Sequence, residues 1–69
     1  MKKYVIKLGD PKYGYYQKHV GDGWLETTLL KSEAFSFDLK IAKEMLSWLN
    51  RNIQFRYCRF DQKNEIEEI

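Results

Sequence analysis

The chain has 69 residues, eleven of them Phe, Trp or Tyr, and its formal net charge is +2. A chain of this length forms one domain and buries only about 60% of its unfolded surface on folding. Its single cysteine, Cys58, and its single histidine, His19, exclude an intrachain disulfide and a Cys/His zinc cluster.

The composition also predicts where the protein is located and how its charge is distributed along the chain. No apolar run approaches the roughly 20 residues that span a bilayer, and the first residues are not apolar enough for a secretory signal. We therefore expect a soluble protein in a reducing cytoplasm, where an unpaired cysteine is usual. Residues 1–60 carry eleven Lys/Arg against six Asp/Glu, whereas residues 61–69 carry one lysine and four acids. The body is thus basic and the end acidic.

Three strands are predicted first. Residues 3–8 alternate between apolar and charged side chains, which is the period of a half-buried strand. Residues 9–12 contain Gly, Asp and Pro and form a turn, and a second strand follows over 13–20. The Gly-Asp-Gly at 21–23 predicts a hairpin into a third strand over 24–30. These elements form an antiparallel meander.

Beyond residue 37 the period changes. Large apolar side chains recur at three- and four-residue spacing, and charged residues occupy the opposite side, which predicts one amphipathic helix of about three to four turns. Ser36 or Asp38 is suited to cap its start, and Asn50 and Asn52 suit its end. The core-facing set is Phe37, Ile41, Met45, Trp48 and Leu49.

Alternation resumes over residues 53–60 and predicts a fourth strand. If it lay parallel to the third strand in the same sheet, the connection through the helix would be right-handed. Residues 61–69 are mostly charged and are expected to fray as an acidic tail. The alternative is a short terminal turn that docks through Ile66 and Ile69.

The predicted fold class is therefore α+β, with a three-stranded antiparallel meander, one amphipathic helix and then a fourth strand. Residues 1–60 form a single βββαβ domain, and residues 61–69 form the tail. The helix covers one sheet face and leaves the other open. The covered face is expected to carry Ile6, Leu8, Leu25, Leu29, Phe55 and Tyr57.

Residues with catalytic potential are few, and we expect no enzyme activity, cofactor or metal. His19 is a possible general base, but no sequence feature brings a nucleophile or acid to it, so we interpret it as an exposed strand residue. Cys58 is interpreted as a packed apolar residue. The sequence contains no phosphate-binding or dinucleotide-binding glycine motif, because its four glycines lie at turns.

A basic aromatic surface is the stronger candidate. Strand parity places Tyr15, Gln17 and Arg56 on the face away from the helix, where rings and cations together form a contact surface. Such a face suits single-stranded nucleic acid. It also suits a protein partner or a second copy of the chain, because Tyr, Phe, Trp and Arg dominate protein interfaces. The candidate contact residues are Lys7, Tyr15, Gln17, His19, Arg56 and Arg59.

Several local patterns are shared with a class of small proteins. They are the opening Tyr4-Val5-Ile6-Lys7, then Gly14-Tyr15-Tyr16, a Gly-flanked turn into Trp24, Ala34-Phe35-Ser36, and Ala42 early in the helix. Over about its first fifty residues the chain resembles short accessory proteins of phages and prophages of low-GC Gram-positive bacteria. The resemblance implies an inhibitor of a host enzyme or of a bacterial defence system, as anti-CRISPR proteins are, acting in the host cytoplasm.

The charge balance refines that expectation. The commonest anti-CRISPR proteins are strongly acidic and mimic DNA, whereas the body of this chain is basic. The leading hypothesis is therefore a non-enzymatic phage-type protein that binds a host or defence protein, or a nucleoprotein complex, by protein–protein contact. The alternative is a small binder of single-stranded nucleic acid that uses the same sheet face.

Overall fold

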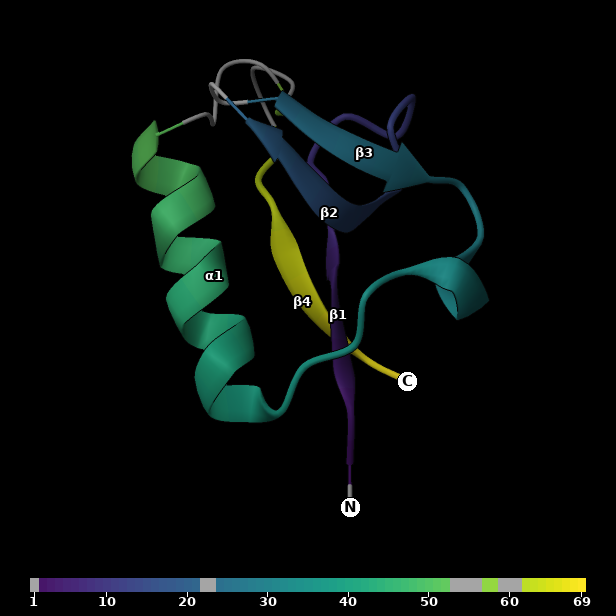
Figure 1. Ribbon diagram of the computed structural model, residues 1–69, viewed down its shortest axis with the longest axis vertical. Coiled ribbons are helices and arrows are strands. Elements are labelled where there is room, and N and C mark those ends of the chain that lie inside the picture. Colours follow the sequence, from purple (N-terminus) through teal and green to yellow (C-terminus); the bar gives the residue numbers. More distant parts are fainter. Residues whose placement is uncertain (1, 22–23, 53–56, 59–61) are drawn as a thin grey trace.

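The computed structural model describes residues 2–21, 24–52, 57–58 and 62–69 (Figure 1). They form a four-stranded antiparallel sheet with the strand order β3-β2-β1-β4 and one α-helix. The predicted α+β class is confirmed. The elements in chain order are β1 (Tyr4–Lys7), β2 (Tyr15–Gly21), β3 (Trp24–Thr28), the 3-10 turn η1 (Lys31–Glu33), α1 (Leu39–Asn52) and β4 (Glu65–Glu68).

The first three strands form the predicted meander. β1 meets β2 at the pair Lys7 and Tyr15, and the Leu8 amide donates to the Gly14 carbonyl over 2.8 Å. Gly14 has a φ of 77°, and a Cβ atom there would lie 2.3 Å from the Thr28 carbonyl oxygen. Only glycine suits this position. The tip of the β2–β3 hairpin lies outside the described residues.

The β2–β3 ladder contains two register shifts, one between Tyr16 and Lys18 and one between His19 and Gly21. A bulge of this kind inserts an extra residue and reverses the side-chain alternation beyond it. His19 consequently pairs with Leu25, a core residue, and shares the covered face with Tyr16. His19 is exposed and lies in a strand, as predicted, but the register shift removes it from the candidate contact face that carries Tyr15.

The chain between β3 and α1 is attached to the sheet. Tyr4 and Phe37 exchange two backbone hydrogen bonds of 2.8 Å, and the Phe35 amide donates to the Tyr16 carbonyl. Asp38 then caps α1, because its Oδ1 accepts from the Ile41 amide over 2.9 Å. Of the two predicted caps, Asp38 is therefore the one that forms this bond.

α1 packs on one face of the sheet, against β1 and β4 (Figure 1). Ala42 and Leu49 are buried, but Ile41 is 43% exposed although its spacing predicted a core position. Leu29 was expected on the covered face and is 70% exposed, because β3 ends at Thr28. The buried cluster comprises Ile6, Leu8, Tyr16, Leu25, Phe37, Ala42, Leu49 and Tyr57.

The position of the fourth strand differs from the prediction. β4 lies at Glu65–Glu68, within the segment expected to fray, and pairs antiparallel with β1 through four residue pairs. Of the predicted strand over 53–60, Tyr57 and Cys58 lie outside any strand, and the other residues, Phe55 included, lie outside the described part. β4 joins the sheet at the edge opposite β3, so the right-handed parallel crossover does not arise.

Two side chains near residue 60 tie this part of the chain to the sheet. The buried Tyr57 accepts a hydrogen bond of 2.9 Å from the Leu25 amide at its hydroxyl, and its carbonyl accepts one from Asp10. Asn64 is 5% exposed, and its Oδ1 accepts from the Gly9 amide over 2.8 Å. These bonds fix the chain that enters β4.

Candidate functional site

The sheet face opposite α1 carries charged side chains from neighbouring strands. Lys7 is paired with Tyr15 across β1 and β2 and with Glu65 across β1 and β4, and Val5 is paired with Glu67. Paired residues project to the same side of an antiparallel sheet. We call this side the open face. Val5 is nevertheless fully buried, so part of the open face is closed to solvent.

Glu67 is the centre of a polar cluster on the open face. Its Oε1 accepts a hydrogen bond of 3.2 Å from the Tyr15 hydroxyl and lies 3.3 Å from the Lys31 Nζ. Its Oε2 lies 3.8 Å from the Lys7 Nζ. We call these four residues the Glu67 cluster. One carboxylate therefore partly offsets the charge of two lysines and orients one tyrosine.

The six predicted contact residues are not all brought together. Lys7 and Tyr15 meet in the Glu67 cluster. Gln17 lies near η1, because its Nε2 donates to the Glu33 carbonyl over 3.2 Å. His19 lies on the covered face, and Arg56 and Arg59 lie outside the described residues.

His19 contacts two aromatic residues. Its ring lies 4.6 Å from that of Trp48 in an edge-on arrangement, and its Nδ1 shares a hydrogen bond of 3.0 Å with the Tyr16 hydroxyl. Burial raises the pKa of Tyr16 above its ordinary value, and a hydrogen bond from the backbone of His19 acts in the opposite direction. This arrangement joins β2 to α1 by packing.

The residues missed by sequence analysis are Lys31 and Glu67. The sequence pattern places Lys31 in no predicted element and Glu67 in the acidic tail. The available signal was the alternation Glu65-Ile66-Glu67, which has the period of a strand with one charged face. The complementarity between this acidic segment and Lys7 of β1 could not be predicted from the sequence, because about sixty residues separate them.

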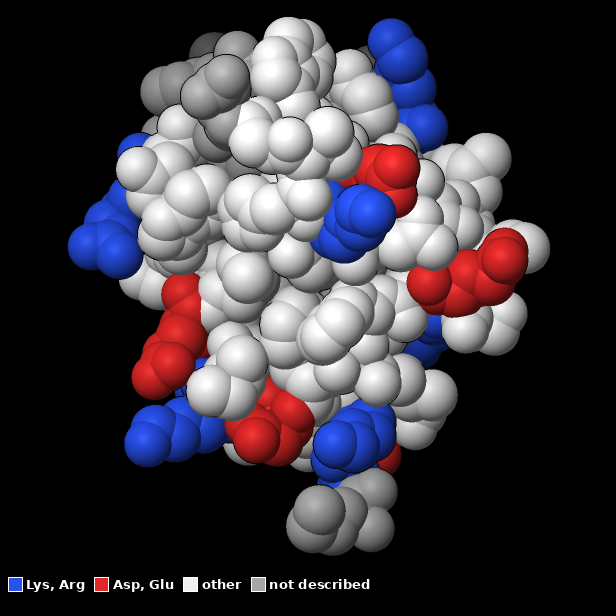
Figure 2. Space-filling view, viewed as in Figure 1, with Lys and Arg blue, Asp and Glu red and all other residues white. Residues whose placement is uncertain are grey.

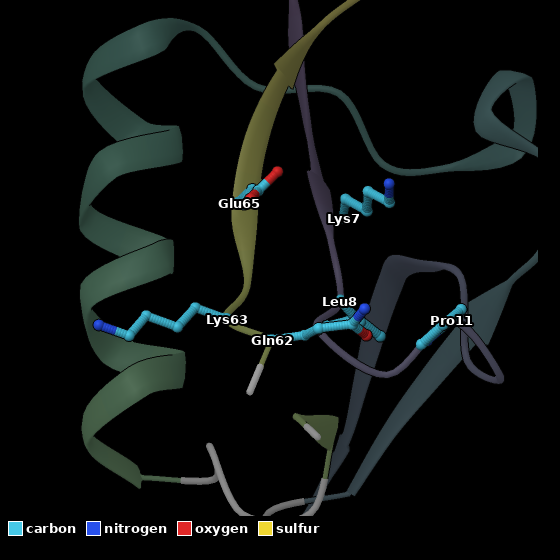
Figure 3. A pocket seen from close by; sticks show the side chains of 7 residues that line it. Lys7, Leu8, Pro11, Gln62, Lys63 and Glu65 are labelled. Carbon is cyan, nitrogen blue, oxygen red and sulfur yellow. The ribbon is translucent and has the colours of Figure 1, made fainter. Parts of the chain in front are cut away.

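A cavity of about 410 Å³ opens where β1 ends and the chain enters β4 (Figure 3). Figure 3 shows Gln62 directed toward Leu8, whereas Lys63 is directed toward α1 and away from Lys7. The polar groups do not converge on one point. The lining residues are Lys7, Leu8, Gly9, Pro11, Gln62, Lys63 and Glu65.

Exposed apolar side chains are concentrated in the chain between β3 and the first turn of α1. This segment, residues 29–41, is called the connection below. It carries five of the eight large apolar side chains that are exposed in the described residues. They are Leu29, Leu30, Phe35, Leu39 and Ile41. Exposed apolar surface that is contiguous is typical of contact sites.

The charged surface has no single sign. Figure 2 shows one face of the molecule, on which basic and acidic side chains are interspersed with broad uncharged areas. Lys2, Lys7 and Lys31 each lie within 4 Å of a glutamate of β4. The acidic strand thus offsets part of the basic body.

Comparisons with known proteins add no relative: no protein-family model matches the chain, and neither a curated protein nor a solved structure is detectably similar to it. Within the described ranges, no helix combines the length and apolar character that crossing a membrane requires. The described residues also contain no group of three or more His, Cys, Asp or Glu side chains placed to hold a metal ion.

Proposed function

We propose that this chain is a non-enzymatic binding protein that inhibits or modulates a host or antiviral-defence protein, in the manner of anti-CRISPR proteins, through protein–protein contact in the host cytoplasm. The observation that carries the proposal is the concentration of exposed apolar side chains in the connection. Leu29 and Leu30 are 70% and 57% exposed, and neither belongs to the buried cluster. Their burial against a partner would remove apolar area from water, which is favourable.

The arrangement of the polar residues supports a protein partner over nucleic acid. Binding to phosphates requires cations that are free to contact them. In the Glu67 cluster, Lys7 and Lys31 already face a carboxylate, and the Tyr15 hydroxyl donates to it. The predicted basic aromatic face is therefore partly neutralised by the chain itself.

The test uses bacteria that carry a defence system active against an infecting phage. Expression of the wild-type chain should restore plaque formation in at least one member of a panel of such systems. The double variant Leu29→Asp/Leu30→Asp should lose this effect, because two charges would be placed where apolar contact is expected. Val20→Asp provides the control, since Val20 is similarly exposed in β2. Circular dichroism should show that all variants are folded.

A parallel capture experiment separates the two classes of partner. Tagged protein is recovered from host lysate with and without nuclease, and the bound material is identified. A stoichiometric protein that survives nuclease and is lost with Leu29→Asp/Leu30→Asp supports the proposal. Recovery of nucleic acid, with proteins lost on digestion, would favour the single-strand binder instead.

A further inference from the structure

The outer edge of β4 presents backbone groups that the sheet does not use. β4 is an edge strand, and the Ile69 amide donates to the Lys3 carbonyl over 2.9 Å. On the other side of β1, the amides of Tyr4 and Leu8 donate to Phe37 and Gly14. The even-numbered amides of β1 therefore face away from β4, and the odd-numbered residues of β1 bond to it.

This alternation fixes the direction of the β4 backbone groups. Hydrogen-bonded and non-hydrogen-bonded pairs alternate along an antiparallel ladder. With Ile69 bonded to β1, the register directs the amides of Glu65 and Glu67 toward β1 as well. The amides and carbonyls of Ile66 and Glu68 are consequently directed outward, where an added strand would meet them.

The charges along this edge favour a basic segment. Glu67 is held in the Glu67 cluster, and the Glu68 Oε1 lies 3.6 Å from the Lys2 Nζ. Glu65 is exposed and has no ion-pair partner among the residues that the structure describes. It is therefore the carboxylate of β4 that an incoming cation would meet.

The cavity beside β4 suits the side chain that would carry such a cation. Glu65 borders it together with Pro11, which is exposed and offers apolar contact to the stem of a long side chain (Figure 3). Lys63 also borders it but is directed toward α1. The Lys7 Nζ lies 3.8 Å from the Glu67 Oε2, and this carboxylate reduces the repulsion between Lys7 and a second cation.

We infer that the β4 edge binds an extended segment of the partner protein as a fifth strand, with a lysine or arginine of that segment placed against Glu65. This inference rests on the proposed function and specifies how the partner is held. Main-chain bonds to Ile66 and Glu68 would provide affinity, and the cavity would provide selectivity. A second copy of the chain suits this edge poorly, because its own β4 would bring glutamates against glutamates.

The probe is a blocked eight-residue peptide of alternating valine and lysine, with a counterpart in which glutamate replaces lysine. Binding is followed by the NMR shifts and solvent exchange of individual amides. The lysine peptide should slow the exchange of the Ile66 and Glu68 amides, and the glutamate peptide should not. Glu68→Pro removes an outward amide and leaves the bonds to β1, so its affinity should fall about tenfold or more. Glu68→Ala removes the same charge but keeps the amide, and should bind within about threefold of wild type.

Equal peptide affinity for Glu68→Pro and Glu68→Ala would overturn the inference. NMR shifts confined to Lys7 and Tyr15 would overturn it too, as would a dimer of the chain that pairs through β4. If the proline variant does not fold, N-methylation of the peptide on its bonding side tests the same bonds, and retained affinity would overturn the inference. Capture of the partner from lysate by Glu68→Pro tests strand addition separately from the proposed function. A partner that Glu68→Pro still captures leaves the proposed function standing and rejects strand addition.

Discussion

Glu67 brings side chains from three elements to one carboxylate on the open face. Tyr15 comes from β2, Lys7 from β1 and Lys31 from η1. Because the two lysine side chains are 48% and 40% exposed, the ion pairs add little to stability. Their main effect is to offset positive charge where a polyanion would otherwise bind.

Replacing Glu67 with glutamine should therefore change binding more than folding. Glu67→Gln keeps the shape of the side chain and leaves the charges of Lys7 and Lys31 without their carboxylate. We expect tighter binding to a single-stranded DNA oligonucleotide, with a steeper loss of affinity as salt rises, and a change in unfolding free energy of no more than about 1 kcal/mol. Fluorescence anisotropy over a salt series measures the first, and chemical denaturation measures the second. Identical affinities would show that the carboxylate does not mask the lysines, and Glu65→Gln is the matched control.

Asn64 has a structural role that its position in the sequence does not suggest. Its Oδ1 accepts from the Gly9 amide and from the Cys58 thiol, and its Nδ2 donates to the Asn50 Oδ1 over 3.2 Å. One side chain thereby connects the turn after β1, the end of α1 and the chain that enters β4. The half-buried Cys58 is a hydrogen-bond donor as well as a packed residue.

Asn64→Ala should lower the unfolding free energy by about 2 to 4 kcal/mol, since buried polar groups lose their partners. Asn64→Asp keeps the acceptor oxygen for Gly9 but loses the amide donor to Asn50. We expect its unfolding free energy to fall less when the new carboxyl is protonated, since it can then donate, than when it is charged. Denaturant titrations at acid and neutral pH measure both. An alanine variant as stable as the wild type would show that water replaces these bonds without cost.

Tyr16 predicts how stability responds to alkaline pH. Burial raises the pKa of Tyr16 above its ordinary value of 10.0, so the folded state favours the neutral hydroxyl. The corresponding stability is complete below about pH 10 and is lost as the pH rises through the folded pKa. Tyr16→Phe should reduce this alkaline loss, and Tyr15→Phe serves as the control. Unfolding free energies between pH 8 and 11 that fall equally in both variants would contradict the assignment.

At the scale of elements, the sequence predicted the strands and the helix whose formation depends on neighbouring residues. The meander and α1 follow from alternation, turn residues and helical spacing. β4 was missed because three of its four residues are glutamates, and their partners on β1 lie about sixty residues away. The position of His19 was missed because a bulge depends on how two strands fit together, and nothing in the order Tyr16 to His19 marks it.

The turn between β1 and β2 depends on a glycine in a way that can be measured. Gly14→Ala would place a methyl group 2.3 Å from the Thr28 carbonyl oxygen at a φ of 77°. We expect a loss of about 2 kcal/mol or more, since steric overlap is added to the backbone cost. Gly21→Ala shares a positive φ, 113°, but meets nothing within 4 Å, so it should cost less. Thermal unfolding of the two variants makes the comparison, and the reverse order would contradict it.

At the scale of the whole molecule, β1 is an interior strand between β2 and β4. Val5 and Ile6 of this strand are fully buried. Removal of residues 65–69 would take away four paired residues and expose one side of β1. The acidic segment is therefore part of the folded unit that contains β1.

We expect a chain that ends at Asn64 to lose cooperative thermal unfolding, because the stability of a small domain is only about 5 to 15 kcal/mol. Near-UV circular dichroism and NMR dispersion measure the loss. A variant that keeps the length but replaces residues 65–69 with glycine and serine should behave similarly. Native spectra for either chain would show that β1 does not need β4.

The pairing of β1 with β4 also sets the order in which the molecule is assembled. The β2–β3 hairpin, the β1–β2 pairing and α1 form from neighbours in the sequence, whereas the other edge of β1 must wait for a segment about sixty residues later. Contacts of such long sequence separation slow folding, because the intervening chain loses entropy before they form. During synthesis β4 leaves the ribosome after α1, so one edge of β1 stays unpaired until then. The nascent chain consequently passes through a stage in which β1 is open to pairing with other strands.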